Sequence, residues 1–139
     1  MVHALEEIRR TLIPGGVLLD LRPLADRWPV EVKSGRADHE IGRLTDLPTG
    51  LADDESANNA IKEASAKGWF VRESEQIFSL FYYWETPEEM REHIKEKWAD
   101  FLQLEEVVFL ASKSAWASAG ADRRVRIRMK MLLTRWRKQ

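Results

Sequence analysis

A carboxylate, a guanidinium and several aromatic rings occur where a substrate pocket could form. The candidates are Asp20, Arg22, Trp28, Tyr83 and Trp84. The first three end or follow a short apolar run, and the last two end a long aromatic one. Because ligands of open α/β sheets bind beyond the carboxyl ends of strands, this placement predicts a pocket with an aromatic wall. The alternative is structural: Arg22 pairs with a carboxylate, and the rings fill the core under the next helix.

Histidine and acidic residues occur together at two places, but neither has the spacing of a metal site. Residues 38–40 (Asp-His-Glu) lie in a predicted hairpin, where adjacent side chains point to opposite faces. His93 shares a helix face with two glutamates, and we expect that face to be solvated because it lies opposite Ile94 and Trp98. With 3 histidines and no cysteine, the chain offers no metallohydrolase or Ser-His-Asp pattern. We therefore predict no metal site and assign no catalytic residue.

The composition is that of a globular domain. The 139 residues are 44% apolar and 32% charged, which predicts a single domain over residues 1–139. The absence of cysteine fits a reducing compartment, and charged residues occupy the N-terminus where a signal peptide needs apolar ones. No apolar run is long enough to cross a membrane. These features predict a cytoplasmic protein with no membrane partner.

Charge is distributed unevenly along the chain. Residues 51–106 carry 14 acids against 6 lysines or arginines, whereas residues 123–139 carry 8 basic residues and no acid. Either the basic segment pairs with the acidic middle, or it binds a polyanion. Glu73 and Glu75 lie on a predicted strand and offer carboxylate partners, and the isoelectric point is about 6.3. We therefore favour internal pairing and expect no nucleic-acid partner.

Hydrophobic periodicity predicts four helices and five strands. Helices are expected at 2–12, 53–67, 86–101 and 104–117, and strands at 17–21, 28–33, 39–45, 69–84 and 124–133. Residues 47–50 are expected to form a loop. The apolar run 17–21 is typical of a strand buried on both faces. The predicted fold class is α/β or α+β, with a single mixed sheet of about five strands and helices packed on it.

The N-terminal segment resembles a known family. Residues 4–20 combine a predicted helix, the turn Pro14-Gly15-Gly16 and an apolar strand. This segment resembles the late helix, Pro-Gly-Gly turn and fifth strand of class I S-adenosylmethionine-dependent methyltransferases. A helix, a strand opened by Gly68-Trp69-Phe70 and a last strand antiparallel to the rest continue in that family's order. The resemblance implies the C-terminal half of a Rossmann-like methyltransferase.

The cofactor-binding part of that family has no counterpart in this sequence. The resemblance begins after the family's Gly-rich loop and ribose-binding acid, and the chain contains no G-x-G-x-G. We therefore assign no cofactor-binding residue and expect no cofactor in the isolated chain; S-adenosylmethionine is implied by the resemblance alone. Two functions remain open: a non-catalytic binding or oligomerisation module, or a methyltransferase fragment or subunit that is active only with the cofactor-binding half.

The resemblance also implies an exposed sheet edge. The strand at 17–21 would lie inside the family's sheet, but here one neighbouring strand is missing. An apolar edge strand exposes unpaired backbone groups, which natural proteins avoid. The hairpin at 28–45 or the N-terminal helix could cover the edge, or a partner could. We expect a twofold homodimer, or another partner that covers this edge.

Overall fold

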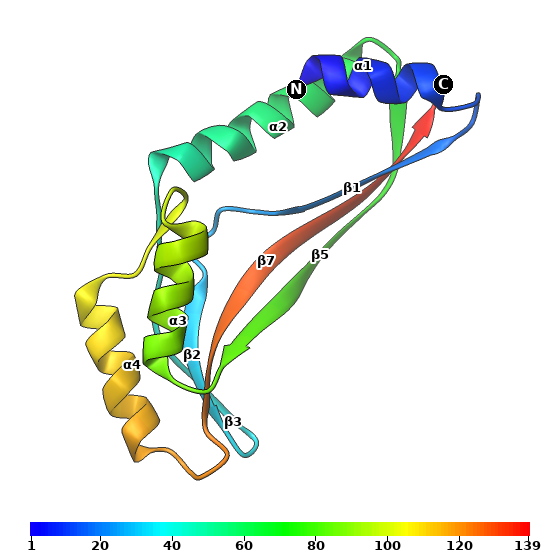
Figure 1. The fold of residues 1–139 in the computed structure, drawn as a ribbon. Coiled ribbons are helices and arrows are strands. Elements are labelled where there is room, and N and C mark those ends of the chain that lie inside the picture. The colour runs from blue at the N-terminus through cyan, green and yellow to red at the C-terminus, as the bar shows by residue number, and fades with distance from the viewer. The chain divides into compact units, whose positions relative to one another are not determined.

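The computed structural model describes residues 1–139 and has an α+β fold (Figure 1). It contains four α-helices, one π-helical turn, a five-stranded, mainly antiparallel sheet and a separate pair of short strands. The predicted fold class is confirmed. None of the helices combines the length and apolar character that a bilayer-spanning segment requires.

The chain divides into two compact units. Unit 1 comprises Met1–Leu24, Ala52–Phe78 and Met131–Gln139, and unit 2 comprises Ala25–Leu51 and Ser79–Lys130. Three elements contribute residues to both units: helix α2 and the two longest strands, β5 and β7. The single domain expected over 1–139 stays a prediction.

Unit 1 consists of strands with helices on one face. Its elements are α1 (Val2–Thr11), β1 (Val17–Pro23), most of α2 (Pro48–Ala66), the first part of β5 (Phe70–Trp84) and the last part of β7 (Arg124–Lys138). β1 pairs antiparallel with β7, from Val17 opposite Arg137 to Pro23 opposite Met131. β5 also pairs with β7, and the arrows in Figure 1 run in opposite directions. The last strand is therefore antiparallel to β1, β5 and β2 (Pro29–Ser34), the strands with which it pairs, whereas β3 (Ala37–Arg43) runs in the same direction as β7.

The core of unit 1 lies between its helices and one face of its strands. Its buried members are Ile61, Ala64, Phe70 and Trp136, against which apolar residues of α1 pack. Gly68 ends α2 with φ +69°, and the N–H groups of Gly68 and Trp69 donate to the last carbonyls of the helix. This left-handed cap is the one that glycine favours. It turns the chain directly into β5.

Unit 2 contains a β-hairpin, two helices and part of each long strand. Its elements are β2 (Pro29–Ser34), β3 (Ala37–Arg43), β4 (Thr45–Asp46), α3 (Pro87–His93), the π-turn η1 (Ile94–Trp98), β6 (Leu102–Gln103) and α4 (Glu106–Ser118). The hairpin β2–β3 is confirmed, and β2 also pairs with the first part of β7. Thr86 caps α3 by accepting a hydrogen bond from Glu89 N–H, as its capping pattern predicts.

Two details of the helices differ from the predictions. Helix α2 begins at Pro48, so residues 47–50 do not form the expected loop. Proline is favoured in the first turn because the N–H that it lacks has no partner inside the helix there. The helix expected at 104–117 is α4, which begins at Glu106 and ends at Ser118; its buried residues are Phe109 and Ser112.

Candidate functional site

Asp20 and Arg22 form a half-buried polar group in unit 1. They are two residues apart on β1, so their side chains lie on the same face. Arg22 Nε lies 3.2 Å from Asp20 Oδ2, and Arg22 Nη2 donates a 2.8 Å hydrogen bond to Oδ1 of Asn58 on α2. The remaining nitrogen, Nη1, is buried and has no hydrogen-bond partner. Sequence reasoning found the pair but missed Asn58, which lies 36 positions away and has no distinctive pattern around it.

A groove of about 260 Å³ runs beside these residues. It is lined by the β1 residues Leu18, Leu19, Asp20 and Leu21 together with side chains of α1 and α2. Successive residues of a strand point to opposite faces, so a cavity that touches four in a row lies along the edge of the strand. The groove therefore follows the free edge of β1, since β7 is the only strand with which β1 pairs.

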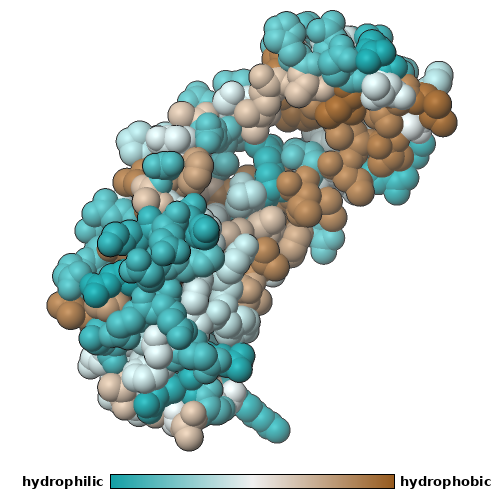
Figure 2. Space-filling view, in the orientation of Figure 1, coloured by the Kyte–Doolittle hydropathy of each residue, from teal (hydrophilic) through white to brown (hydrophobic).

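One face of the unit 1 sheet is uncovered and carries large exposed apolar side chains. On β1, Leu19 is 62% and Leu21 is 59% exposed, and on β5, Val71 is 49% and Ile77 is 55% exposed. Phe70 and Trp136 point to the opposite face, where α1 and α2 pack. Figure 2 shows hydrophobic surface gathered beside α1, where β1 and β5 lie in Figure 1. The prediction that residues 17–21 are buried on both faces is wrong, because helices cover only one face of this edge strand.

Ion pairs lie on the same uncovered face. Glu73 of β5 contacts Arg135 at 2.8 Å and also pairs with Arg137, both from β7. The hydrogen bond from Arg137, with the positive charges of both arginines, lowers the pKa of the Glu73 carboxyl. Glu75 instead pairs with Arg72 on its own strand. Of the two glutamates proposed as partners for the basic segment, Glu73 has that role and Glu75 does not.

The aromatic candidates lie in unit 2 and divide between the two faces of β5. Trp84 stacks on Tyr82 with ring centres 6.0 Å apart, and both rings meet Trp98 edge to face. Trp28 is buried and contacts Trp98 in the same way at 5.9 Å. Tyr83 faces the other side, where its hydroxyl accepts a 3.2 Å hydrogen bond from Arg126 Nη1. Adjacent residues of a strand cannot line one wall, so Tyr83 and Trp84 do not form a single site.

His93 joins this aromatic cluster, contrary to the expectation of a solvated face. Its ring lies 4.9 Å from that of Trp98 and 5.2 Å from that of Trp84. The cause is the π-turn η1, whose hydrogen bonds reach five residues along the chain instead of four. Residues 93 and 98 are five apart, so this turn brings them onto one face. In a regular α-helix they would lie on different faces.

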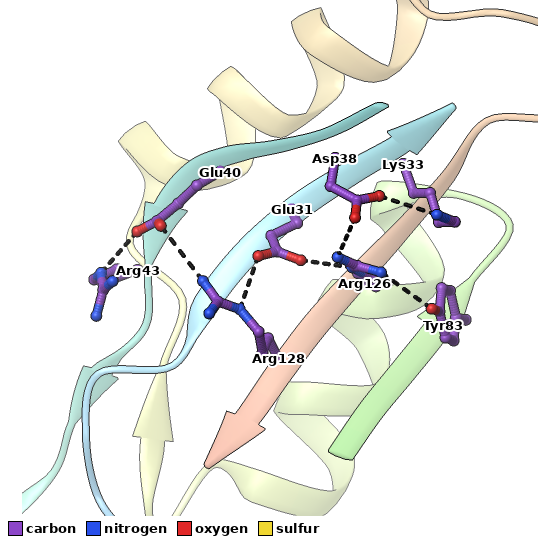
Figure 3. A network of polar contacts seen from close by, with 8 residues as sticks. All are labelled: Glu31, Lys33, Asp38, Glu40, Arg43, Tyr83, Arg126 and Arg128. Carbon is purple, nitrogen blue, oxygen red and sulfur yellow. Dashed lines mark hydrogen bonds and ion pairs between the residues drawn. The ribbon is translucent and has the colours of Figure 1, made fainter. Parts of the chain in front are cut away.

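A buried ionic network joins the strands of unit 2 (Figure 3). Arg126 Nε donates a 2.5 Å hydrogen bond to Glu31 Oε2, and Arg128 Nε donates a 2.9 Å bond to Glu31 Oε1. Arg126 also reaches Asp38 at 2.9 Å and stacks on the ring of Phe81. Burial opposes its charge, but the hydrogen bonds from Arg126 to Tyr83 and Glu31 raise the pKa of the guanidinium. The charged groups at the centre pair with one another, so the network joins strands β2, β3 and β7.

The basic C-terminal strand is largely neutralised within each unit. In unit 2 its basic residues pair with Glu85, Glu31, Asp38, Glu40 and Asp26, and in unit 1 with Glu73. This observation supports internal pairing over polyanion binding, because cations held by carboxylates make a poor phosphate-binding track. Arg123 stacks on Trp116 instead.

The five sequence candidates therefore form two groups: Asp20 and Arg22 in unit 1, and Trp28, Tyr83 and Trp84 in unit 2. No group of three or more metal-ligating side chains comes together. No protein-family model matches the chain, and no characterised protein or solved structure proved significantly similar to it. The arrangement in unit 1 is the stronger candidate because it combines a groove, a buried unpartnered donor and an uncovered apolar face.

Proposed function

We propose that this chain is a methyltransferase-derived binding or oligomerisation module that has no S-adenosylmethionine site of its own and docks through unit 1. The uncovered apolar sheet face carries this proposal. Soluble proteins seldom expose contiguous apolar patches, and those that do commonly use them as interaction surfaces. Lacking cysteine, the module fits the reducing cytoplasm.

The arrangement of helices supports the same proposal. Sheets of the doubly wound type carry helices on both faces, and their strands are then buried on both sides. In unit 1, the core between the helices and the sheet includes Leu18 of β1, Trp136 of β7 and Phe70 of β5, whereas large apolar side chains on the other face are in contact with solvent. If this sheet descends from one with helices on both faces, its exposed apolar residues once packed against helices. They now form a surface to which another polypeptide could bind.

A second candidate function is a fragment or subunit of an S-adenosylmethionine-dependent methyltransferase, active only with the cofactor-binding half. Arg22 favours it, because it lies near the carboxyl end of β1, where ligands of such sheets bind, and it pairs with Asp20. The unpartnered Nη1 of Arg22 could serve an anionic or carbonyl group there. Genomic sequence upstream of the codon for Met1 tests this candidate: an in-frame first half with a Gly-rich loop would favour the enzyme.

Calorimetric titration of the chain with S-adenosylmethionine tests the absence of a cofactor site. We expect no binding heat at ligand concentrations of about 100 µM, since the chain has no Gly-rich loop to hold the nucleoside. A micromolar Kd would overturn the module proposal. Loss of that heat in Arg22→Gln but not in Arg91→Gln, a half-exposed arginine of unit 2, would place the cofactor at Arg22.

Binding of the dye 8-anilinonaphthalene-1-sulfonate tests the uncovered face directly. We expect dye fluorescence with the native chain, and a clear decrease in the double variant Leu19→Lys/Ile77→Lys, which places charge on both strands of the face. Leu110→Lys is the control, because Leu110 is 55% exposed on α4 of unit 2. Equal fluorescence from the native chain and the double variant would show that this face is not an accessible apolar surface.

A further inference from the structure

We propose that the partner of unit 1 is a second copy of this chain, whose β1 pairs antiparallel with β1 across a twofold axis at Leu21. This inference rests on the proposed docking role of unit 1 and names the occupant. The two sheets would become one continuous sheet, and the same surface would serve both subunits, as a twofold interface requires.

The backbone of β1 presents free hydrogen-bonding groups along its outer edge. Lys138 N–H donates to the carbonyl oxygen of Gly16, so that carbonyl points toward β7. Because backbone groups alternate along a strand, those of Leu19 and Leu21 point to the free edge. With the axis at Leu21, the two copies of that residue exchange two hydrogen bonds, and Leu19 N–H meets the carbonyl of Pro23 in the second copy.

In this register, the charged residues of β1 face residues of opposite charge on the second copy. Antiparallel pairing about Leu21 places Asp20 opposite Arg22 of the second copy, and Arg22 opposite Asp20 of that copy. Residues next to a hydrogen-bonded pair form a non-hydrogen-bonded pair, in which the side chains are closer. Arg22 Nη1 has no partner inside the chain, and the opposite carboxylate would supply one. The single edge strand thus carries an acid and a base at the spacing that self-pairing needs.

The surface around this edge fits a strand as its occupant. The groove along Leu18–Leu21 lies where the second β1 would run. Leu19, Leu21 and Pro23 share the uncovered face, so pairing about Leu21 aligns apolar side chains across the interface. The outer strand β5 is less suited, because Arg72, Glu73 and Glu75 place charges along it, and charged side chains protect edges from pairing.

Pairing about Leu19 is the competing register. It would place Asp20 opposite Leu18 and Arg22 opposite Gly16 of the second copy, so neither charge of β1 would face an opposite charge. It would also leave Arg22 Nη1 without a partner. Pairing about Leu21 forms one backbone bond fewer at each Pro23, whose nitrogen carries no hydrogen, but it matches every charge. We therefore place the axis at Leu21.

Charge-reversal variants of Asp20 and Arg22, alone and mixed with one another, test both the dimer and its register. In sedimentation velocity, the native chain should run at twice the monomer mass of 16.2 kDa. Asp20→Arg and Arg22→Asp should each weaken self-association at least tenfold, because each places like charges opposite one another. An equimolar mixture of the two variants should regain the dimer, since each arginine pair then faces an aspartate pair. The double variant D20R/R22D should also dimerise.

Four results would overturn the proposal. They are a monomeric native chain, single variants that dimerise like the native chain, a mixture of folded single variants that stays monomeric, and a double variant that does not dimerise. If either single variant fails to fold, Leu21→Lys replaces it, because this side chain is 59% exposed and its backbone stays intact. Leu21→Lys should be a folded monomer, whereas the control Leu110→Lys should remain a dimer; a dimeric Leu21→Lys would exclude this edge.

Failure of this proposal and failure of the proposed function give different results. A monomeric chain that binds no S-adenosylmethionine would leave unit 1 as a module for another partner. A dimer that binds the cofactor with micromolar Kd would keep the interface and refute the non-catalytic module. The calorimetric and sedimentation experiments therefore separate the two inferences.

Discussion

The two units differ in how far they bury the apolar residues of their strands. In unit 2, Val30 and Val32 of β2 are 0% and 1% exposed, and even the charged Glu31 between them is buried and paired. In unit 1, Leu19 and Leu21 of β1 are more than half exposed. β2 has strands on both sides, β3 and β7, whereas β1 has β7 alone. Unit 2 has the features of a self-sufficient scaffold, and unit 1 those of an incomplete one.

The two units differ in what substitutions within them should change. A buried ion pair costs much to disturb, because removing one partner leaves an uncompensated charge. An apolar sheet face with a free edge has the opposite properties, because its groups gain partners when another polypeptide binds. We therefore expect substitutions in unit 2 to change stability, and substitutions on the uncovered face of unit 1 to change association.

Removing the centre of the unit 2 network should have the largest effect on stability. Glu31→Ala leaves the buried Arg126 without its closest carboxylate, and Arg128 loses a partner as well. We expect the free energy of unfolding to fall by about 3–5 kcal/mol, because an uncompensated charge stays buried. Equilibrium unfolding in urea measures this free energy. The control Glu40→Ala removes a half-exposed carboxylate and should cost at most about 1 kcal/mol; equal losses would refute the central role of Glu31.

The aromatic cluster of unit 2 should be the next most sensitive. Trp98→Ala removes the ring that contacts Trp28, Tyr82, Trp84 and His93. We expect a loss of about 3 kcal/mol of unfolding free energy, together with a reduced near-ultraviolet circular dichroism signal. Leu110→Ala, an exposed apolar truncation on α4, should stay within about 0.5 kcal/mol of the native chain. A native-like spectrum from Trp98→Ala would show that the rings do not pack as described.

The same substitution in both units sharpens the comparison. Val32→Thr buries a hydroxyl in unit 2 and should cost about 1–3 kcal/mol, whereas Val71→Thr exposes the hydroxyl on the uncovered face and should change stability by less than about 0.5 kcal/mol. Thermal unfolding of the two variants side by side measures the difference. A similar loss from Val71→Thr would mean that the uncovered face is covered within the native chain.

The smallest expected effect is on the titration of one carboxylate in each unit. The hydrogen bond from Lys33, aided by Arg126, lowers the pKa of Asp38 in unit 2, and Arg137 and Arg135 lower that of Glu73 in unit 1. A lowered pKa stabilises the folded state above the unfolded-state pKa, and this contribution is lost as the pH falls through the folded-state pKa. NMR titration should show both carboxyls below their ordinary values of 3.8 and 4.5.

Arg137→Gln provides the matched variant for that titration. It should raise the pKa of Glu73 toward its ordinary value and leave that of Asp38 unchanged, because the two carboxylates have different cationic partners. A shift of both values together would indicate a change in folding instead of the loss of one ion pair.

The sequence alone determined most of the elements and a smaller part of the charge pairing. Periodicity located the helices and strands, since a 3.6-residue or two-residue repeat is visible in the chain itself. The cap at Thr86 and the glycine at position 68 marked helix ends by local hydrogen-bonding rules. The excess of acids in the middle and bases at the end indicated the pairs that Glu73 makes with β7.

Only the tertiary structure decided which faces these elements bury. The run Val17–Leu21 is as apolar as a fully buried strand, yet it forms an edge strand that is covered on one side. Its own residues do not determine how many strands and helices pack against it. The π-turn at Ile94–Trp98 likewise moved His93 into an aromatic cluster that regular helical spacing excludes. Asn58 can accept a hydrogen bond from Arg22 because α2 packs beside β1. Helices, strands and their ends depend on residues close together in the sequence. The burial of a face depends on which distant segments pack against it, so it is a property of the whole folded chain.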